Sequence, residues 1–363
     1  MAVTTRALVS REVNVPPKLE EITLDSLRPD EVLVEIHATG ICHTDFSCMD
    51  GTLPAAFPGV FGHEVGDQVT QVQKNDKVLL SFDHCGSCPQ CNEGNPAYCY
   101  EWFTRNFGQK RTDGSVSMAT PDGTKVHGSF FGQSSFARLT IVSSASIVKV
   151  PADTRLDLFC PLGCGVQTGA GAILNRLDVQ PGKSVAIFGV GSVGMSAVLA
   201  AKLRDAKVIV AVDLQPQRLE LAKKLGATHT ILGSDDDLVA QIQKISGKNG
   251  VDYSLDCVGF PQVVENALDC LGTCGKGATV GVPSPGVRAG VDICSYLVLG
   301  RQYLGCCEGD SNPQKFVPYL MEQHAQGRFP LEEMITYYPV KDFEKALKDL
   351  KEGKTVKAVL VWD

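Results

Sequence analysis

The sequence predicts an α/β protein of two domains, one of which is built on a doubly wound parallel sheet. Three observations support this prediction. The length of 363 residues exceeds that of most single domains. The first third has the pattern of short strands and loops, punctuated by glycine and proline. From Ser184 onwards, strand patterns alternate with helix patterns, which indicates a parallel sheet with right-handed crossovers.

In the first third, the hydrophobic pattern predicts several short strands. Residues 31–39 alternate between apolar and polar, as a half-buried strand does. Further strands are predicted at residues 65–72, 78–82 and 136–142. Residues 108–125 are polar and contain few apolar side chains, so we expect a surface loop there.

The strand and helix alternation begins at residues 184–190, a continuous apolar strand of the kind that is covered on both faces. The predicted elements that follow are a helix at 193–203, a strand at 208–212, a helix at 217–225, a strand at 229–232, a helix at 237–245, a strand at 253–258, a helix at 263–271 and a strand at 278–282. A helix at 343–350 and a strand at 357–361 complete the prediction.

Composition and charge argue against several classes of function. The hydrophobic share of 44% and the charged share of 21% are typical of a globular protein. No run approaches the roughly 20 apolar residues of a membrane helix, and a net charge of −7 gives no basic surface for nucleic acid. The N-terminal residues lack the apolar core of a secretory signal. Fourteen cysteines without such a signal indicate a reducing compartment, the cytoplasm.

A glycine-rich loop follows the first strand of the predicted parallel sheet. It has the spacing G-x-G-x-x-G and consists of Gly189, Val190, Gly191, Ser192, Val193 and Gly194. Glycines recur in any tight turn, but this loop joins an apolar strand to a helix, which is the context of a dinucleotide-binding loop. Asp213 ends the next strand, about 20 residues on, where a carboxylate bonds the ribose hydroxyls. Its charge opposes a 2′-phosphate and favours NAD over NADP; the nearby Arg218 weakens this preference without reversing it.

Four cysteines lie close together in the first third: Cys85, Cys88, Cys91 and Cys99. Four soft ligands at this spacing fit a closed tetrahedral zinc site. An iron–sulfur cluster is the alternative, because the first three cysteines also resemble a ferredoxin run. A full set of cysteine ligands leaves no open coordination position, so we expect this site to stabilise its loop.

A second set of candidate ligands is dispersed along the chain. Cys42, His63 and Cys164 stand in the short segments GICHTD, GHE and GCGVQTG. Spacing alone does not connect them, and each could equally be a core residue.

These segments, in this order and together with the four cysteines and the glycine-rich loop, resemble the zinc-dependent medium-chain alcohol dehydrogenase family. The resemblance covers nearly the whole chain. It implies a GroES-like, mostly-β catalytic domain formed by residues 1–165 and 309–363. It also implies a Rossmann NAD-binding domain formed by residues 166–308, with the catalytic cleft between the two.

The resemblance also implies two zinc ions per subunit, NAD as cofactor, and a homodimer or homotetramer. Cys42, His63 and Cys164 would bind the catalytic zinc, and Glu64 would be able to approach the metal. The fourth coordination position would then be open to water or substrate. Contact between subunits would involve residues 278–282 and 291–304.

Further roles follow from the same resemblance. Asp45 would orient His63, and Thr44 would bond the substrate alcohol and begin a proton relay. Ser47 stands where many members of the family carry a histidine at the outer end of that relay, and serine is no base at neutral pH. Residues matching the cofactor contacts are His43 and Lys357 at the pyrophosphate and Thr168 at the nicotinamide.

The implied reaction is the reversible oxidation of a primary alcohol to its aldehyde, with hydride transfer to NAD. Residues 131–136 and the missing relay histidine look closest to the aryl-alcohol (benzyl alcohol) branch. Glutathione-dependent formaldehyde dehydrogenases carry acidic residues where this chain has Gly51 and Leu53, and arginine where it has Phe103. Candidate pocket residues are Phe46, Leu53, Phe57 and Phe103, with Ser81 at a position that is often aromatic in the family.

Two alternatives within this fold are a zinc-free NAD(P)-binding reductase or non-catalytic relative, and a polyol dehydrogenase. The intact set of three ligands argues against the first, and Cys164 argues against the second, which usually has glutamate there. The other eight cysteines are expected in the core, since free cysteine packs as a small hydrophobe. They are Cys48, Cys160, Cys257, Cys270, Cys274, Cys294, Cys306 and Cys307.

Overall fold

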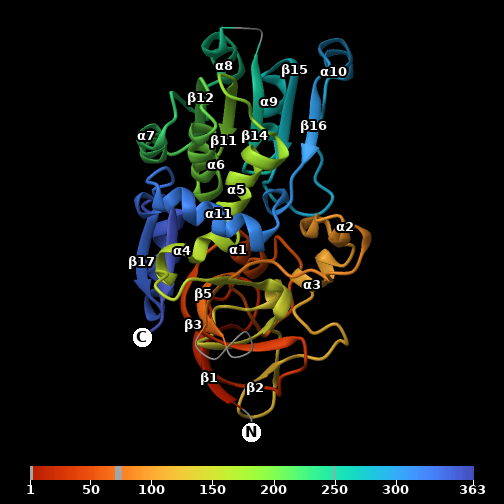
Figure 1. The fold of residues 1–363 in the computed structure, drawn as a ribbon, viewed down its shortest axis with the longest axis vertical. Helices are drawn as coiled ribbons and strands as arrows, with labels where there is room; N and C mark the ends of the chain where they lie inside the picture. Colours follow the sequence, from red (N-terminus) through yellow and green to blue (C-terminus); the bar gives the residue numbers. More distant parts are fainter. Residues whose placement is uncertain (1–2, 70–75, 248–249) are drawn as a thin grey trace. The chain divides into compact units, whose positions relative to one another are not determined.

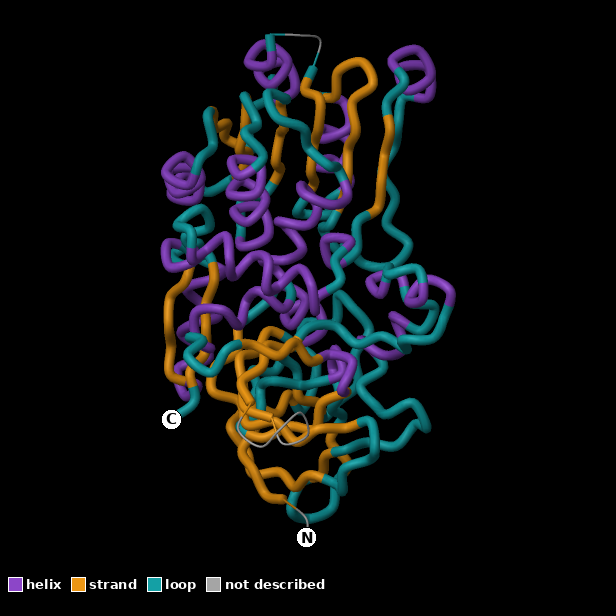
Figure 2. The backbone as a smooth tube through the Cα atoms, viewed as in Figure 1, coloured by secondary structure: helices purple, strands orange, loops and turns teal. Residues whose placement is uncertain are grey.

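The computed structural model describes residues 3–69, 76–247 and 250–363. The chain divides into two compact units. The first consists of Met1–Cys164, Asn312–Glu322 and Leu331–Asp363, and the second of Gly165–Ser311 and Gln323–Pro330. The resemblance implies that residue 165 and all of 309–363 belong to the first domain, whereas here residues 165, 309–311 and 323–330 group with the second unit. Figure 2 shows that the first unit is mainly strand and loop, while the second alternates strands with helices.

The first unit contains two sheets, whose strands are labelled in part in Figure 1. Its strands are β1 (Val3–Ser10), β2 (Lys18–Leu24), β3 (Glu31–Gly40), β4 (Gly59–Val60), β5 (Glu64–Val69), β6 (Asp76–Leu80), β7 (Met118–Ala119), β8 (Lys125–Val126), β9 (Leu139–Ser143), β10 (Ile147–Val150), β17 (Ile335–Pro339) and β18 (Lys357–Val361). One sheet has the order β4-β1-β2-β7-β8, and the other β10-β6-β5-β3-β18-β17 with β9 also paired to β3. Every pair is antiparallel except β17 with β18.

The helices of this unit are short and connect the strands. They are α1 (His43–Met49), α2 (Pro89–Asn92), α3 (Trp102–Phe107), α4 (Leu156–Phe159), α12 (Phe343–Lys351), and most of α11 (Pro313–Ala325), whose last turn belongs to the second unit. A 3-10 turn, η2 (Phe130–Gly132), precedes β9.

Strand β3 is central to this unit because it pairs along its length with β9, β5 and β18. The register places Gly40, its last residue, opposite Glu64 of β5 on one side and Val359 of β18 on the other. Three distant parts of the chain therefore meet at the end of β3. The loop that carries Cys42 leaves from this same point.

The strands predicted in the first unit are present with shifted ends. The strand predicted at 65–72 is β5, which starts at Glu64, and its last three predicted residues lie outside the described range. The strands predicted at 78–82 and 136–142 are β6 and β9. The prediction of a surface loop at 108–125 is wrong in part, because Arg111 is buried there.

Arg111 is buried because three acceptors surround its guanidinium. Its Nε and Nη2 donate to the two carboxylate oxygens of Glu31 at 2.6 and 2.8 Å, and Nη1 donates to Asp25 at 2.5 Å. Nη2 also donates to the carbonyl of Ser26 at 3.0 Å. The polar composition of this segment thus reflects an internal ion-pair anchor as well as solvent contact.

The second unit is a parallel sheet of six strands. They are β11 (Ser184–Phe188), β12 (Val208–Asp213), β13 (His229–Leu232), β14 (Val251–Asp256), β15 (Leu271–Thr279) and β16 (Gln302–Gly305). The helices are α5 (Gly165–Gly171), α6 (Ser192–Leu203), α7 (Pro216–Leu225), α8 (Leu238–Ser246), α9 (Pro261–Asp269) and α10 (Ile293–Leu299), and a π-helical segment (Ala172–Arg176) follows α5. The order β13-β12-β11-β14-β15-β16 is the doubly wound order, 3-2-1-4-5-6, of a Rossmann fold.

The predicted alternation of strands and helices in this unit is confirmed. All five residues of β11 are buried, as its continuous apolar sequence predicts. Apolar side chains of the strands and of α8 and α9 form one core cluster, which includes Phe188, Val210 and Ile242. Burying each side chain of this size contributes about 1.5–3 kcal/mol. The last predicted strand is displaced, because β15 starts in a glycine-rich stretch at Leu271 that has no apolar run.

Candidate metal and cofactor sites

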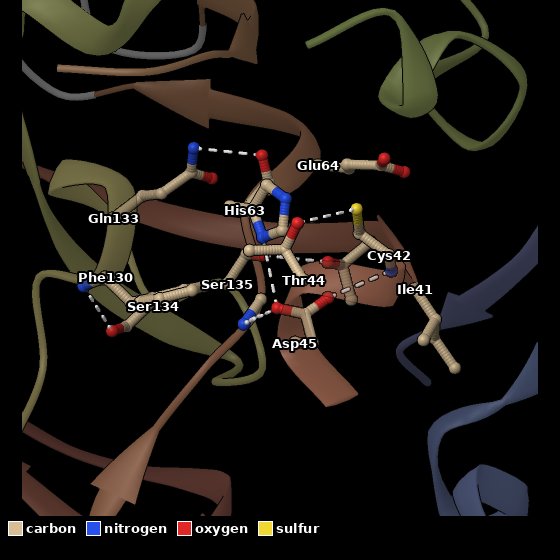
Figure 3. Close-up of polar contacts among 12 residues, drawn as sticks. Ile41, Cys42, Thr44, Asp45, His63, Glu64, Phe130, Gln133, Ser134 and Ser135 are labelled. Carbon is tan, nitrogen blue, oxygen red and sulfur yellow. Dashed lines mark hydrogen bonds and ion pairs between the residues drawn. The ribbon is translucent and has the colours of Figure 1, made fainter. Parts of the chain in front are cut away.

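The dispersed candidate ligands come together in the first unit. Ligand atoms of Cys42, His63, Glu64 and Cys164 all lie within 4.8 Å of one another. Cys42 is the residue before helix α1, His63 directly precedes β5, and Cys164 follows the 3-10 turn of residues 160–163. Figure 3 shows His63, Glu64 and Cys42 converging from the ends of these elements.

This group fits a zinc ion. The His63 side chain is fully buried and its Nδ1 donates to Asp45, while its Nε2 has no hydrogen-bond partner among the described residues. A buried ring nitrogen without a partner is costly unless it has another ligand. Two thiols and one imidazole are the donor set that zinc favours, with one position left open. A hydrogen bond with Cys164 and the charge of His63 lower the pKa of the Cys42 thiol well below its ordinary value, against the effect of burial.

Asp45 connects three parts of this site. Its Oδ1 accepts from His63 Nδ1 and from the Gly62 backbone N–H, both at 3.0 Å. Its Oδ2 accepts from the Cys42 backbone N–H at 2.9 Å, which is one half of a capping box at the start of α1. The carboxylate is fully buried and therefore fixes two ligand-bearing loops at once.

The remaining predicted relay residues lie on α1. Cys42 Sγ donates to Thr44 Oγ1 at 3.6 Å, so this hydroxyl lies beside a candidate zinc ligand. Ser47 is buried, at 4% exposed. His43 is exposed, and its ring meets Phe46 edge-on with centroids 6.2 Å apart. The relay roles of Thr44 and Ser47 and the cofactor contact of His43 stay predictions.

Glu64 forms a buried ion pair that the sequence does not predict. Lys357 Nζ donates to both carboxylate oxygens of Glu64, at 2.8 and 2.7 Å, and to the carbonyl of Ile41 at 3.0 Å. These three acceptors match the three N–H donors of an ammonium group. The predicted contact of Lys357 with the cofactor pyrophosphate would therefore require this arrangement to change. Gly40 makes room for the pair, since a Cβ there would lie 2.1 Å from Glu64 Oε2.

The four clustered cysteines form the second group of metal ligands. The sulfurs of Cys85, Cys88, Cys91 and Cys99 also lie within 4.8 Å of one another. Backbone N–H groups point at them: those of Ser87 and Cys88 donate to Cys85 Sγ at 3.5 and 3.3 Å. These N–H donors lower the pKa of the Cys85 thiol to about 6, although burial opposes them. This environment stabilises the thiolate of Cys85, whereas burial raises the pKa of the Cys91 thiol to about 12.

All fourteen cysteines are free thiols. The expectation that the eight unassigned cysteines pack in the core is wrong for Cys274 and Cys294, which are exposed. Cys274 lies in the glycine-rich strand β15, and Cys294 lies in helix α10, none of whose residues is buried.

The three glycines of the G-x-G-x-x-G loop differ in their surroundings. Gly189 has a φ of +82°, which turns the chain out of β11. A Cβ on Gly191 would meet no described atom within 4 Å, so the backbone is open to a ligand there. A Cβ on Gly194 would lie 1.9 Å from the carbonyl oxygen of Gly189. A tight turn, an open approach and close helix packing are the three glycine roles of a dinucleotide-binding loop.

Asp213 ends β12 beside this loop. Its Oδ2 accepts from the Val190 backbone N–H at 2.8 Å, and its Oδ1 accepts from Gln215 N–H at 2.9 Å. Arg218 Nη1 lies 3.8 Å from Oδ2. Thr168, on α5, donates from its hydroxyl to Glu308 at 3.4 Å. Contacts of these residues with a cofactor stay predictions.

Aromatic residues surround His63, and sequence reasoning missed most of them. Phe131 stacks on the imidazole, with ring centroids 4.3 Å apart and planes 18° apart, and Phe130 meets it edge-on at 5.4 Å. Phe107 contacts both phenylalanines. Only the resemblance of residues 131–136 to one branch of the family marked this segment. Of the predicted pocket residues, Leu53 is buried, Phe46 and Phe57 are half-buried and Phe103 is 58% exposed.

Comparison with known proteins agrees with both sites. Residues 28–152 match the family described as "Alcohol dehydrogenase GroES-like domain", and residues 192–323 match "Zinc-binding dehydrogenase". Geraniol dehydrogenase from Castellaniella defragrans is 38% identical, over 99% of this chain and 98% of that protein. S-(hydroxymethyl)glutathione dehydrogenase from Synechocystis sp. is 35% identical, over 98% and 99%.

Two solved structures are similar over almost their whole length. Benzyl alcohol dehydrogenase from Acinetobacter calcoaceticus superposes with a TM-score of 0.95 at 39% identity, covering 99% of this chain and 100% of that one. An alcohol dehydrogenase zinc-binding domain protein from Burkholderia ambifaria gives 0.96 at 41% identity, covering 99% of both. No helix within the described residues has the length and apolarity that a membrane span needs. With its two groups of zinc ligands, the chain belongs to the zinc-dependent medium-chain alcohol dehydrogenases, oxidoreductases that act on the CH–OH group.

Proposed function

We propose that this enzyme reversibly oxidises a primary aromatic or allylic alcohol to its aldehyde with NAD. The observation that carries the proposal is the convergence of Cys42, His63 and Cys164, where His63 Nε2 has no hydrogen-bond partner among the described residues. Three protein ligands leave a fourth position for substrate, whereas a structural site would be closed.

The residues of the site divide the work of the reaction. When bound, zinc polarises the alcohol oxygen and NAD accepts the hydride. Thr44, whose hydroxyl lies 3.6 Å from Cys42 Sγ, would accept the alcohol proton while its own proton passes to solvent water. Asp45 holds the His63 tautomer that leaves Nε2 free for the metal. Ser47 is only 4% exposed, and its hydroxyl is not a base at neutral pH. We therefore do not assign it the role of final proton acceptor.

Two relatives and the local chemistry support the substrate class. The similar proteins include a geraniol dehydrogenase and a benzyl alcohol dehydrogenase. The predicted pocket residues Phe46 and Phe57 are half-buried and would offer apolar aromatic surface to such a substrate. Gly51, Leu53 and Phe103 provide no charged partner for the ammonium and carboxylate groups of a glutathione adduct. S-(hydroxymethyl)glutathione is therefore the substrate that we propose this enzyme rejects, although related enzymes are named for it.

For the cofactor, we propose NAD over NADP. The carboxylate of Asp213 stands at the end of β12, where it would meet the ribose hydroxyls and repel a 2′-phosphate. Arg218 lies close to that carboxylate and would be neutralised in part by it. We also propose a reducing compartment such as the cytoplasm, because the thiols of both metal sites must stay reduced to bind zinc.

The enzyme is further proposed to be a homodimer or homotetramer through the edge of the second unit's sheet. Strand β16 is the last strand of that sheet. The preceding helix, α10, exposes Ile293, Leu297 and Val298 by 78%, 80% and 72%. An apolar group of this kind next to a free sheet edge is typical of a contact surface. Sedimentation of the protein tests this, and a monomer at micromolar concentration contradicts it.

The function is tested by measuring zinc per subunit together with NADH formation from benzyl alcohol, geraniol, ethanol and S-(hydroxymethyl)glutathione. Two zinc ions, turnover of the first two alcohols and little turnover of the last are expected. Cys42→Ser should keep one zinc and lose turnover. One zinc and no turnover in the unaltered enzyme would instead favour the zinc-free or non-catalytic alternative. Preference for the glutathione adduct would overturn the substrate class.

A further inference from the structure

The imidazole of His63 is held between aromatic rings. Phe131 covers one face, with centroids 4.3 Å apart and planes only 18° apart. Phe130 meets the ring edge-on, at 5.4 Å and 76°. Asp45 fixes the position of His63 Nδ1 through one hydrogen bond, but the imidazole ring could still rotate about that bond. The stacked ring of Phe131 limits this rotation and so sets the tilt of the imidazole.

The backbone that carries Phe131 is unusual. Phe131 itself has a φ of +53° and a ψ of +35°, a left-handed conformation that bulky residues rarely adopt. Ser129, Gly132 and Ser134 also have positive φ values. Such a run persists only where the surrounding structure holds it in place, and it is concentrated at functional sites.

The surrounding contacts hold this turn against the loop of His63. Four successive carbonyl groups, those of residues 60–63, each accept a hydrogen bond from residues 133–136. The donors are Ser134 Oγ to Val60 at 2.7 Å, Phe136 N–H to Phe61 at 2.9 Å, Ser135 N–H to Gly62 at 2.9 Å and Gln133 Nε2 to His63 at 3.1 Å. Figure 3 shows Gln133 reaching the carbonyl of His63. The turn and the ligand loop therefore move as one body.

Helix α3 also packs against the Phe131 ring. Phe107 contacts it at 5.3 Å and Trp102 at 6.0 Å, the latter with planes 88° apart. Phe131 is 3% exposed, so no solvent space is open into which its ring could swing. Its position follows from its ring contacts with His63, Phe107 and Trp102 and from the four hydrogen bonds of residues 133–136.

We propose that Phe131 is a positioning residue that sets the tilt of the His63 imidazole towards the catalytic zinc and slows the release of that zinc. The inference rests on the proposed catalytic role of Cys42, His63 and Cys164. A metal-bound imidazole is electron-poor, which strengthens its attraction to the π-face of the phenyl ring. An aromatic pair of this kind is worth a factor of about 2 to 10 in an equilibrium constant.

The test is the rate at which the purified holoenzyme releases zinc to 4-(2-pyridylazo)resorcinol, a coloured chelator, in the absence of substrate. The unaltered enzyme should release zinc in two phases, one for each site. Cys42→Ser identifies the catalytic phase, because this variant lacks it. If the unaltered enzyme has no such phase, the proposed function fails, which is a different result from failure of the positioning role.

Two variants then isolate the stacked ring. Phe131→Leu removes the flat ring and should speed the catalytic phase about fivefold while the structural phase stays unchanged. Phe130→Leu is the matched control, since it removes a buried phenylalanine of the same turn that meets His63 only by its edge. Its catalytic phase should speed up less than that of Phe131→Leu, because an edge contact does not lie along the face of the imidazole and so does not set its tilt. An unchanged structural phase also shows that each variant is folded. If Phe131→Leu is not folded, Phe131→Met replaces it, because methionine keeps more of the side-chain volume of phenylalanine.

Cobalt(II) in the catalytic site gives a second readout. A change in the tilt of the imidazole alters the ligand field, so Phe131→Leu should shift the d–d absorption bands and Phe130→Leu should leave them in place. Equal release rates in Phe131→Leu and the unaltered enzyme would overturn the proposal. So would equal acceleration in both variants, because that result would assign the effect to general loss of packing.

Discussion

Asp45→Asn is the sharpest test of how the catalytic site is held. The aspartate accepts three hydrogen bonds, from Cys42 N–H, Gly62 N–H and His63 Nδ1, at 2.9 to 3.0 Å. Asparagine has one acceptor oxygen and one N–H₂ group. In its better orientation it keeps the two bonds made by Oδ1 and turns N–H₂ towards the Cys42 N–H, so that two donors face each other.

The expected magnitude follows from this count. The part-buried backbone N–H of Cys42 loses its partner, which costs about 1–3 kcal/mol. The bond to His63 also loses its charge assistance, and charge-assisted bonds are roughly twice as strong as neutral ones. A free-energy difference of about 1.4 kcal/mol corresponds to a factor of ten. The affinity of the catalytic site for zinc and the value of kcat/KM should therefore each fall by about 10- to 100-fold. The substitution changes a single atom in type, so volume and packing are preserved.

The assay compares zinc content after dialysis against a chelator with kcat/KM for benzyl alcohol. Two zinc ions per subunit should fall towards one, because the four-cysteine site is untouched. Asp50→Asn is the control: it makes the same change at the end of the same helix, on an exposed side chain that bonds only Thr52 N–H among the described contacts. Retention of both zinc ions with unaltered kcat/KM in Asp45→Asn would refute the reasoning.

Three further variants test other parts of the structure. Arg111→Met leaves Glu31 buried without its ion-pair partner and should lower the free energy of unfolding by about 3–5 kcal/mol, measured by urea denaturation. The double variant Arg111→Met/Glu31→Gln should recover part of this loss. An unchanged urea midpoint in Arg111→Met would contradict the anchor role. Cys91→Ser should remove one zinc per subunit and lower the melting temperature, while the turnover of freshly purified protein stays close to that of the unaltered enzyme. Asp213→Ala should reduce the ratio of kcat/KM for NAD to that for NADP; an unaltered ratio would remove the ribose argument.

The sequence was informative where contacts are local. The close spacing of the four clustered cysteines predicts that their sulfurs lie together, because one short loop can bring them together without help from the rest of the fold. They are Cys85, Cys88, Cys91 and Cys99. The glycine-rich loop is local in the same sense, since strand β11, the turn and helix α6 are consecutive. The centre of the parallel sheet was predictable because β11 and β12 are almost fully buried and have nearly continuous apolar sequences.

The missed features are contacts between residues far apart in the chain. Glu64 and Lys357 are separated by 293 positions, and they meet because β3 pairs with β5 on one side and with β18 on the other. Arg111 and Glu31 are separated by 80 positions, so the sequence around Arg111 does not show that its side chain forms a buried ion pair. Its polar composition therefore predicts a surface loop. No hydrophobic periodicity encodes such pairs; they depend on sheet register, which the pattern of one strand does not specify.

The two zinc sites differ in what holds them before any metal binds. His63 and Cys164 each follow a glycine at which a side chain would collide with the backbone or a neighbour: 2.4 Å from Phe136 at Gly62, and 1.8 Å from the carbonyl of Leu80 at Gly163. Close backbone packing and Asp45 therefore fix the catalytic ligands through the protein itself. The loop of the four cysteines has mostly exposed residues between its ligands, with little core of its own. Metal removal should accordingly leave the catalytic site in place and release the four-cysteine loop, because only the second depends on its metal for folding.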